Sequence, residues 1–243
     1  MNSEARPAFY ALGSGGWRDY VTLLHPPYTV WHLAYVVIGG ALAPRTDWPV
    51  LGLTLLAFLL AMGIGAHALD ELRGRPLRTR IPSRTLVVLA AVSIAAAAAI
   101  GVAVAVQRSL WLLAFVAFGA FIVVAYNLEL SGGRFHSDLW FGLAWGGFPL
   151  LTAYFAVAGR IRVEALLAAA FAVVLSLAQR ALSTPVREVR RRVAAVAGTI
   201  EYRDGTSRPL APDALTGPQE RALKLLAAAT VLLAAALVAR RLV

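Results

Sequence analysis

The chain of 243 residues contains no cysteine. This absence excludes disulfide bonds, thiolate nucleophiles and metal sites built on cysteine. The first 19 residues also lack the basic stretch followed by an apolar stretch that is typical of a cleavable signal peptide. We therefore expect the first apolar segment to be retained as a membrane span.

Long polar stretches are scarce, because 59% of the residues are hydrophobic and the mean hydropathy is +0.69. This composition is too apolar for an ordinary soluble domain of this length. Several segments reach the roughly 20 apolar residues that cross a bilayer. We predict one integral membrane domain over residues 1–243, an all-α bundle of transmembrane helices. Seven spans are expected, at about residues 28–45, 49–70, 85–107, 109–130, 138–158, 161–181 and 221–239.

Acidic residues are also few, 13 against 23 lysines and arginines, which gives a net charge of +10. The arginines gather after the second span and in a basic loop over residues 183–218. The positive-inside rule places these loops and the N-terminus in the cytoplasm, with the plasma membrane as the expected location. The basic loop is either a lid or a solvated linker. We attribute the charge to topology and anionic lipid, and we expect no binding of nucleic acid.

All four histidines and most acidic residues at membrane depth belong to the same end of the predicted spans. Charged groups at such depth usually face a bundle interior and mark a site. The candidate metal ligands are His32, His67, Asp70, Glu71, Glu129, His136 and Asp138, with His25 beside them. The alternative roles are structural, such as an interhelical hydrogen bond for His32 or a helix cap for Asp138.

Several motifs within residues 18–180 are informative together. The segment Ala66–Gly74 is followed by Arg75-Pro76-Leu77, and Tyr126 stands at the end of the fourth predicted span. Leu23–Thr29 precedes the first span, and Gly146–Pro149 lies in the fifth. In these features the chain resembles the UbiA superfamily of intramembrane prenyltransferases, which has an acidic motif followed by Arg-Pro-Leu, a tyrosine at the end of its fourth helix, a similar first-helix start, and a stretch of small residues and proline in its fifth helix.

The resemblance implies prenyl transfer from an allylic diphosphate, with an isoprenoid or lipid substrate and Mg²⁺ as cofactor. Asp70 and Glu71 then hold the magnesium ion, and Tyr126 orients the acceptor, so that Asp70 and Tyr126 are the candidate catalytic residues. Arginine side chains suit phosphate because they bind it through two parallel hydrogen bonds. The candidate substrate-binding residues are Arg73, Arg75, Arg78, Asn127 and Arg187.

The sequence departs from the family pattern at several acidic positions. His67 and Gly74 replace two aspartates of the first motif. The second acidic motif is absent, and Gln179, Arg180 and Ser183 stand in its place. Two alternatives therefore stay open. One is a metalloenzyme that acts on a lipid through iron or zinc held by imidazole and carboxylate. The other is a non-enzymatic protein that binds or transports lipid.

Overall fold

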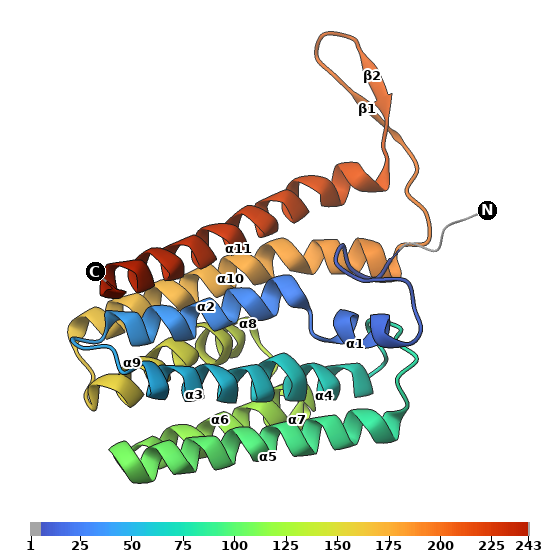
Figure 1. Ribbon diagram of the computed structural model, residues 1–243. Coiled ribbons are helices and arrows are strands. Elements are labelled where there is room, and N and C mark those ends of the chain that lie inside the picture. The colour runs from blue at the N-terminus through green and yellow to red at the C-terminus, as the bar shows by residue number, and fades with distance from the viewer. Residues whose placement is uncertain (1–5, 243) are drawn as a thin grey trace.

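The structure is a computed structural model, and it describes residues 6–242. It is nearly all-α, with 75% of the residues in helices. The long helices lie side by side along one axis, and a two-stranded hairpin projects from one end of the bundle (Figure 1). We refer to this end, where the N-terminal segment also lies, as the polar end.

The elements of the first half form two pairs of long rods after a short N-terminal helix. They are α1 (Trp17–Leu23), α2 (Pro26–Leu42), α3 (Trp48–Phe58), η1 (Leu59–Ala66), α4 (His67–Leu72), α5 (Ser83–Arg108) and α6 (Leu112–Asn127). The π-helix η1 continues α3 into α4, so that Trp48–Leu72 is one rod.

The second half has three long rods and a hairpin. Its elements are α7 (Leu130–Gly133), α8 (Asp138–Phe141), η2 (Gly142–Gly147), α9 (Phe148–Ala158), α10 (Val163–Arg192), β1 (Thr199–Glu201), β2 (Ser207–Pro209) and α11 (Pro212–Leu242). The π-helix η2 joins α8 to α9 in one rod, Asp138–Ala158. The two strands pair antiparallel, with Ile200 opposite Arg208.

Local sequence signals explain where the helices begin and end. Pro26 and Pro27 occupy the first turn of α2, where the backbone needs no N–H donor. The Asp47 side chain caps α3 by accepting a hydrogen bond from the Val50 N–H at 3.1 Å. Gly159 ends α9 in the left-handed region, with φ of 68°.

Five helices among the described residues are long and apolar enough to cross a membrane, which is consistent with an integral membrane protein. They are Trp48–Leu72, Ser83–Arg108, Asp138–Ala158, Val163–Arg192 and Pro212–Leu242. The expectation of seven spans is corrected, because α2 and α6 have only 17 and 16 residues. At roughly 1.5 Å per residue they are about 25 Å long, shorter than a hydrocarbon core of about 30 Å.

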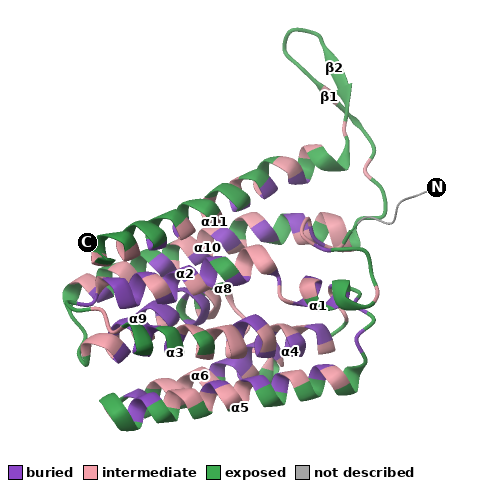
Figure 2. Cartoon of the chain, viewed as in Figure 1, coloured by how far each residue is buried: buried purple, intermediate pink, exposed green. Residues whose placement is uncertain are grey.

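The outer helices α5 and α11 have exposed faces (Figure 2), and these faces carry apolar side chains. Val88 and Val92 are exposed on α5, and Leu225 and Leu232 are exposed on α11. Large apolar surfaces of this kind mark contact with another apolar phase. They fit helices whose outer faces meet lipid.

The basic loop is shorter than the expected residues 183–218. Helix α10 continues through Pro185 to Arg192, and α11 begins at Pro212. Two contacts explain the longer α10. Val186 is buried, and Arg190 forms a two-pronged ion pair with Glu220 of α11, in which the Nη2–Oε2 distance is 2.9 Å.

Close packing of α2 against α9 provides a first prediction. A Cβ atom added to Gly39 meets the backbone oxygen of Leu150 at 2.2 Å, so a rigid element has to move. We expect Gly39→Ala to lower the free energy of unfolding by about 1–3 kcal/mol. Thermal unfolding in detergent measures the effect. The control is Gly52→Ala in α3, where a Cβ meets nothing within 4 Å, and where alanine stabilises a helix by up to about 1 kcal/mol. Equal melting temperatures for the two variants contradict the packing of α2 on α9.

Candidate functional site

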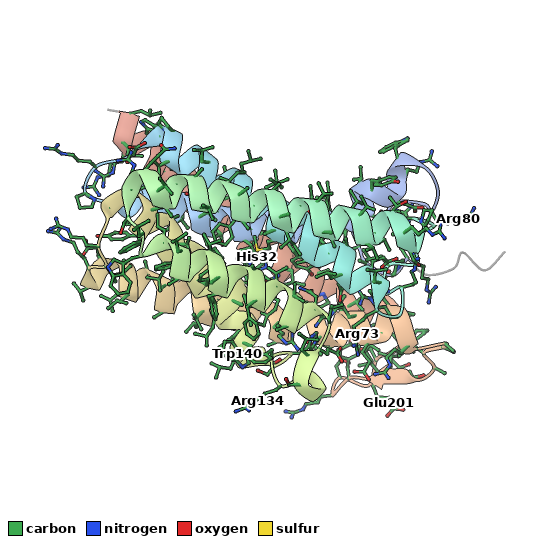
Figure 3. All side chains as sticks on the ribbon, turned by 90° about the horizontal axis from the view of Figure 1, so that it is seen from below. His32, Arg73, Arg80, Arg134, Trp140 and Glu201 are labelled. Atoms are coloured by element: carbon green, nitrogen blue, oxygen red, sulfur yellow. The ribbon has the colours of Figure 1, made fainter. Side chains whose placement is uncertain are left out.

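A polar cavity of about 320 Å³ opens among the helices toward the polar end of the bundle. Its walls come from α2, η1, α4, α6, α8, η2, α10 and the N-terminal segment. Figure 3 shows His32 in the middle of the bundle, with Arg73 and Arg80 toward the polar end. The residues singled out from the sequence that line the cavity are His25, His32, His67, Asp70, Tyr126, Asn127, Glu129, His136 and Arg187.

The four histidines share one hydrogen-bonding arrangement. Each Nδ1 atom lies 2.8–3.1 Å from a backbone carbonyl oxygen, and the pairs are His25 with Leu23, His32 with Trp145, His67 with Gly63, and His136 with Tyr126. Because a carbonyl only accepts, Nδ1 must carry the hydrogen, and a neutral ring then leaves Nε2 as an acceptor. The cavity therefore presents imidazoles that can take a proton or ligate a metal.

Ring contacts fix the positions of these imidazoles. The His25 and His67 ring centroids are 4.0 Å apart. Tyr126 stacks on His136 at 4.4 Å. Burial lowers the pKa of His25 well below its ordinary value, and the neighbouring His67 lowers this pKa further. His25 is thus a neutral base at physiological pH.

Asp70 is the acidic residue of the cavity wall whose carboxylate is available to a ligand. Within residues 6–242 its side chain makes no hydrogen bond or ion pair, although it lines the cavity. Glu129 also lines the cavity, but its Oε2 atom pairs with Arg73 Nη2 at 2.7 Å. The Nη1 atom of Arg73 donates to the Leu128 carbonyl oxygen. A cation or a hydrogen-bond donor that enters the cavity can therefore bind the Asp70 carboxylate without displacing a protein partner.

Glu71 lies away from the cavity, contrary to its expected role as a metal ligand. The side chain is fully buried. It accepts hydrogen bonds from the Leu77 N–H at 2.9 Å, and from the N–H and the hydroxyl of Thr79 at 2.9 and 2.8 Å. Neighbouring positions on a helix are rotated by about 100°, so Asp70 and Glu71 face different surroundings. Glu71 organises the loop between α4 and α5.

Asp138, Arg73, Arg75 and Arg78 are likewise outside the cavity lining. The Asp138 side chain is exposed and forms an ion pair with Arg180. Arg75 has a left-handed backbone, with φ of 51°, and it donates to the Ile81 carbonyl and the Ser83 hydroxyl. Arg78 is exposed. The loop after α4 folds onto the start of α5, and its three arginines are not among the residues that line the cavity.

Helix α10 supplies the cationic groups of the cavity, and these include the expected Arg187. Arg180 and Arg191 line the cavity with Arg187. The spacing 180, 187 and 191 repeats about every 3.6 residues, which places the three arginines on one face of a helix. This periodicity was the available signal. Arg180 also donates from Nη1 to the Tyr126 hydroxyl.

An apolar cavity of about 100 Å³ adjoins the polar one. Its walls come from α3, η1, α5, α6, η2 and α9, with Phe115 and Phe148 among them. Met62 of η1 and Trp145 of η2 line both cavities. Both residues belong to π-helical segments, which are frequent at functional sites. A charged compartment and an apolar compartment thus share a wall.

The ligand arrangement suits some metals better than others. Among residues 6–242, no group of three or more histidine, aspartate or glutamate side chains is placed to hold one metal ion. Catalytic zinc and non-haem iron sites use about three protein ligands. Magnesium is often held by one or two carboxylates together with substrate phosphates and water. The free Asp70 beside the arginines meets that smaller requirement.

Comparison of the whole chain with protein-family models, curated proteins and solved structures finds no match.

Proposed function

We propose that this protein is a membrane-embedded, UbiA-like enzyme that acts on an isoprenoid or lipid diphosphate, with prenyl transfer from an allylic diphosphate as its reaction. One observation carries the proposal. The polar cavity holds a free carboxylate and three arginines, and it shares Met62 and Trp145 with an apolar cavity. An amphiphile with an anionic head and an apolar tail fits such a pair of compartments.

The chemistry follows from the groups around the head. The allylic carbon–oxygen bond breaks, and its electron pair leaves with the diphosphate. The Arg187 and Arg191 guanidinium groups stabilise the charge that develops on this leaving group. The acceptor forms the new bond to carbon and gives its proton to an unprotonated imidazole of the cavity. Tyr126, held by Arg180, orients the acceptor.

Magnesium is the cofactor in this proposal. Asp70 would supply its protein ligand, and phosphate oxygens and water would supply the others. The orientation of the four histidine rings favours a second candidate, a metalloenzyme that uses iron or zinc to act on a lipid. Elemental analysis of the purified protein separates the two. Bound iron or zinc that is lost in both His67→Ala and His136→Ala supports the second candidate.

Binding of a fifteen-carbon allylic diphosphate tests the two-compartment proposal. We expect this amphiphile to bind more tightly than either inorganic pyrophosphate or the fifteen-carbon alcohol, because each of these fills one compartment. Arg187→Gln should weaken diphosphate binding about tenfold or more, since it removes charge-assisted hydrogen bonds to phosphate. Isothermal titration in detergent micelles measures the affinities.

Arg208→Gln is the matched control, because Arg208 lies in the exposed hairpin. Diphosphate binding should be unchanged in this variant. Equal affinity of the wild-type protein for the diphosphate and for the alcohol contradicts an anionic head in the cavity. Tight binding without release of pyrophosphate in the presence of magnesium favours a non-enzymatic lipid-binding protein instead.

A further inference from the structure

The N-terminal segment before α1 forms a wall of the polar cavity. Figure 1 shows this segment crossing the polar end of the bundle between α10 and α1. Pro7, Ala8, Phe9 and Tyr10 all line the cavity. We refer to residues 6–16 as the N-terminal strap. No membrane helix supplies this wall, and its sequence carries no motif of the candidate site.

Contacts along the strap attach it to other elements. Ala8 and Ala11 are buried against Leu77 of the loop between α4 and α5. The Leu12 N–H donates to the Thr22 hydroxyl of α1 at 3.0 Å. These contacts attach the strap on both sides of Phe9 and Tyr10.

Two cationic side chains make further contacts with the strap. Arg191 of α10 donates from Nε to the Pro7 carbonyl at 3.4 Å. The Lys224 ammonium group of α11 lies 5.0 Å from the centre of the Phe9 ring, within the range of a cation–π interaction. Arg191 also lines the cavity. A single guanidinium group thus touches both the strap and the space that receives the ligand.

Tyr10 is the strap residue whose side chain can donate a hydrogen bond to a ligand. Its ring centroid lies 5.3 Å from that of His25 and 5.6 Å from that of Tyr28. In the described part of the chain its hydroxyl has no hydrogen-bond partner, and the residue lines the polar cavity, so the hydroxyl is available to a ligand. Burial raises the pKa of Tyr10 well above its ordinary value. The hydroxyl therefore keeps its proton and remains a donor beside Arg187 and Arg191.

We propose that Tyr10 is a substrate-binding residue whose hydroxyl donates to the phosphate or diphosphate head of the ligand, and that the strap covers the head at this side of the cavity. This inference rests on the proposed function, because it takes the anionic head as given. It adds a group from outside the helical bundle to the site. It also makes the strap the element that shields the head from bulk water.

Tyr10→Phe tests the hydroxyl alone, because phenylalanine keeps the ring contacts. In the presence of magnesium, we expect its affinity for inorganic pyrophosphate to fall about tenfold, the effect of one hydrogen bond to a charged group. Isothermal titration measures this change. Tyr20→Phe is the control, because Tyr20 is exposed on α1 and should leave the affinity unchanged.

The position of the strap over the bound head is tested by labelling the Phe9→Cys variant, which carries the sole cysteine of an otherwise cysteine-free chain. Pyrophosphate at ten times its dissociation constant should slow the maleimide reaction about tenfold, because the bound head occupies the cavity that residue 9 lines. Arg203→Cys in the hairpin should react at the same rate with and without pyrophosphate.

The outcomes separate this inference from the proposal beneath it. Wild-type affinity in Tyr10→Phe, or a Phe9→Cys rate that pyrophosphate leaves unchanged, overturns the inference while the anionic-head proposal stands. If the wild-type protein binds neither pyrophosphate nor the fifteen-carbon diphosphate, both are overturned.

Discussion

Asp70→Asn is expected to abolish magnesium-dependent release of pyrophosphate from an allylic diphosphate while leaving the protein folded. The Asp70 carboxylate lines the cavity and makes no hydrogen bond or ion pair with other described residues. Its loss therefore removes no structural contact. Asparagine has nearly the same size but lacks the negative charge that a hard cation needs. We expect activity to fall by about 100-fold or more, the typical effect of removing a group that stabilises charge in the transition state.

Glu129→Gln is the control for this experiment, because Glu129 also lines the cavity but pairs with Arg73. A smaller effect on activity is expected there, since that carboxylate is already neutralised. The melting temperature of Asp70→Asn should equal that of the wild-type protein. Activity within threefold of the wild-type value would remove Asp70 from the magnesium site. Activity that returns with zinc or iron but not with magnesium would favour the histidine-based alternative.

The location of the polar layer could be anticipated from the sequence for a simple physical reason. Arginine-rich loops fix which helix ends share a side of the membrane. Histidines and acids close to those ends then fall at one depth. The structure places His25, His32, His67 and His136 around one cavity, which depth alone does not require. The rotation of each helix about its axis also has to direct the rings inward, and hydrogen bonds to backbone carbonyls hold them there.

The rotation of each helix about its axis also explains why the structure places some residues differently from the expectation based on the sequence. Asp70 and Glu71 are adjacent and chemically alike, yet only one of them lines the cavity. The arginines after α4 were expected at the phosphate, but Arg75 donates instead to the Ile81 carbonyl and the Ser83 hydroxyl. Contacts between residues far apart in the sequence determine which way these side chains face, and a single sequence does not reveal such contacts.

The extent of α10 is another instance of tertiary contacts prevailing over local signals. Pro185 inside a helix removes one backbone hydrogen bond and usually marks an end. Here Val186 is buried, and Arg190 pairs with Glu220 in α11. Both contacts lie beyond the proline, so the helix is stabilised on both sides of the break. This extension is what brings Arg187 and Arg191 to the cavity.

Glu71→Ala is expected to cause the largest loss of stability among single substitutions near the site. Three donors, the N–H groups of Leu77 and Thr79 and the Thr79 hydroxyl, depend on this fully buried carboxylate. Alanine leaves all of them unsatisfied in the loop between α4 and α5. Each hydrogen bond to a charged group contributes about 1.5–3 kcal/mol, and the contributions are not additive. We therefore expect a loss of about 3–5 kcal/mol, comparable to breaking a buried ion pair.

Circular dichroism during heating in detergent measures this loss, which corresponds to a decrease of roughly 10 °C in melting temperature for a chain of this size. Glu188→Ala is the matched control, because Glu188 is exposed on α10. The melting temperature of Glu71→Gln should fall between those of Glu71→Ala and Glu188→Ala, because the amide keeps one acceptor oxygen but directs an N–H₂ group at a donor. A Glu71→Ala protein that melts like the wild type but loses magnesium-dependent activity contradicts the loop-organising role. That result would return Glu71 to the set of metal ligands beside Asp70, and it would require the α4–α5 loop to open when the diphosphate binds.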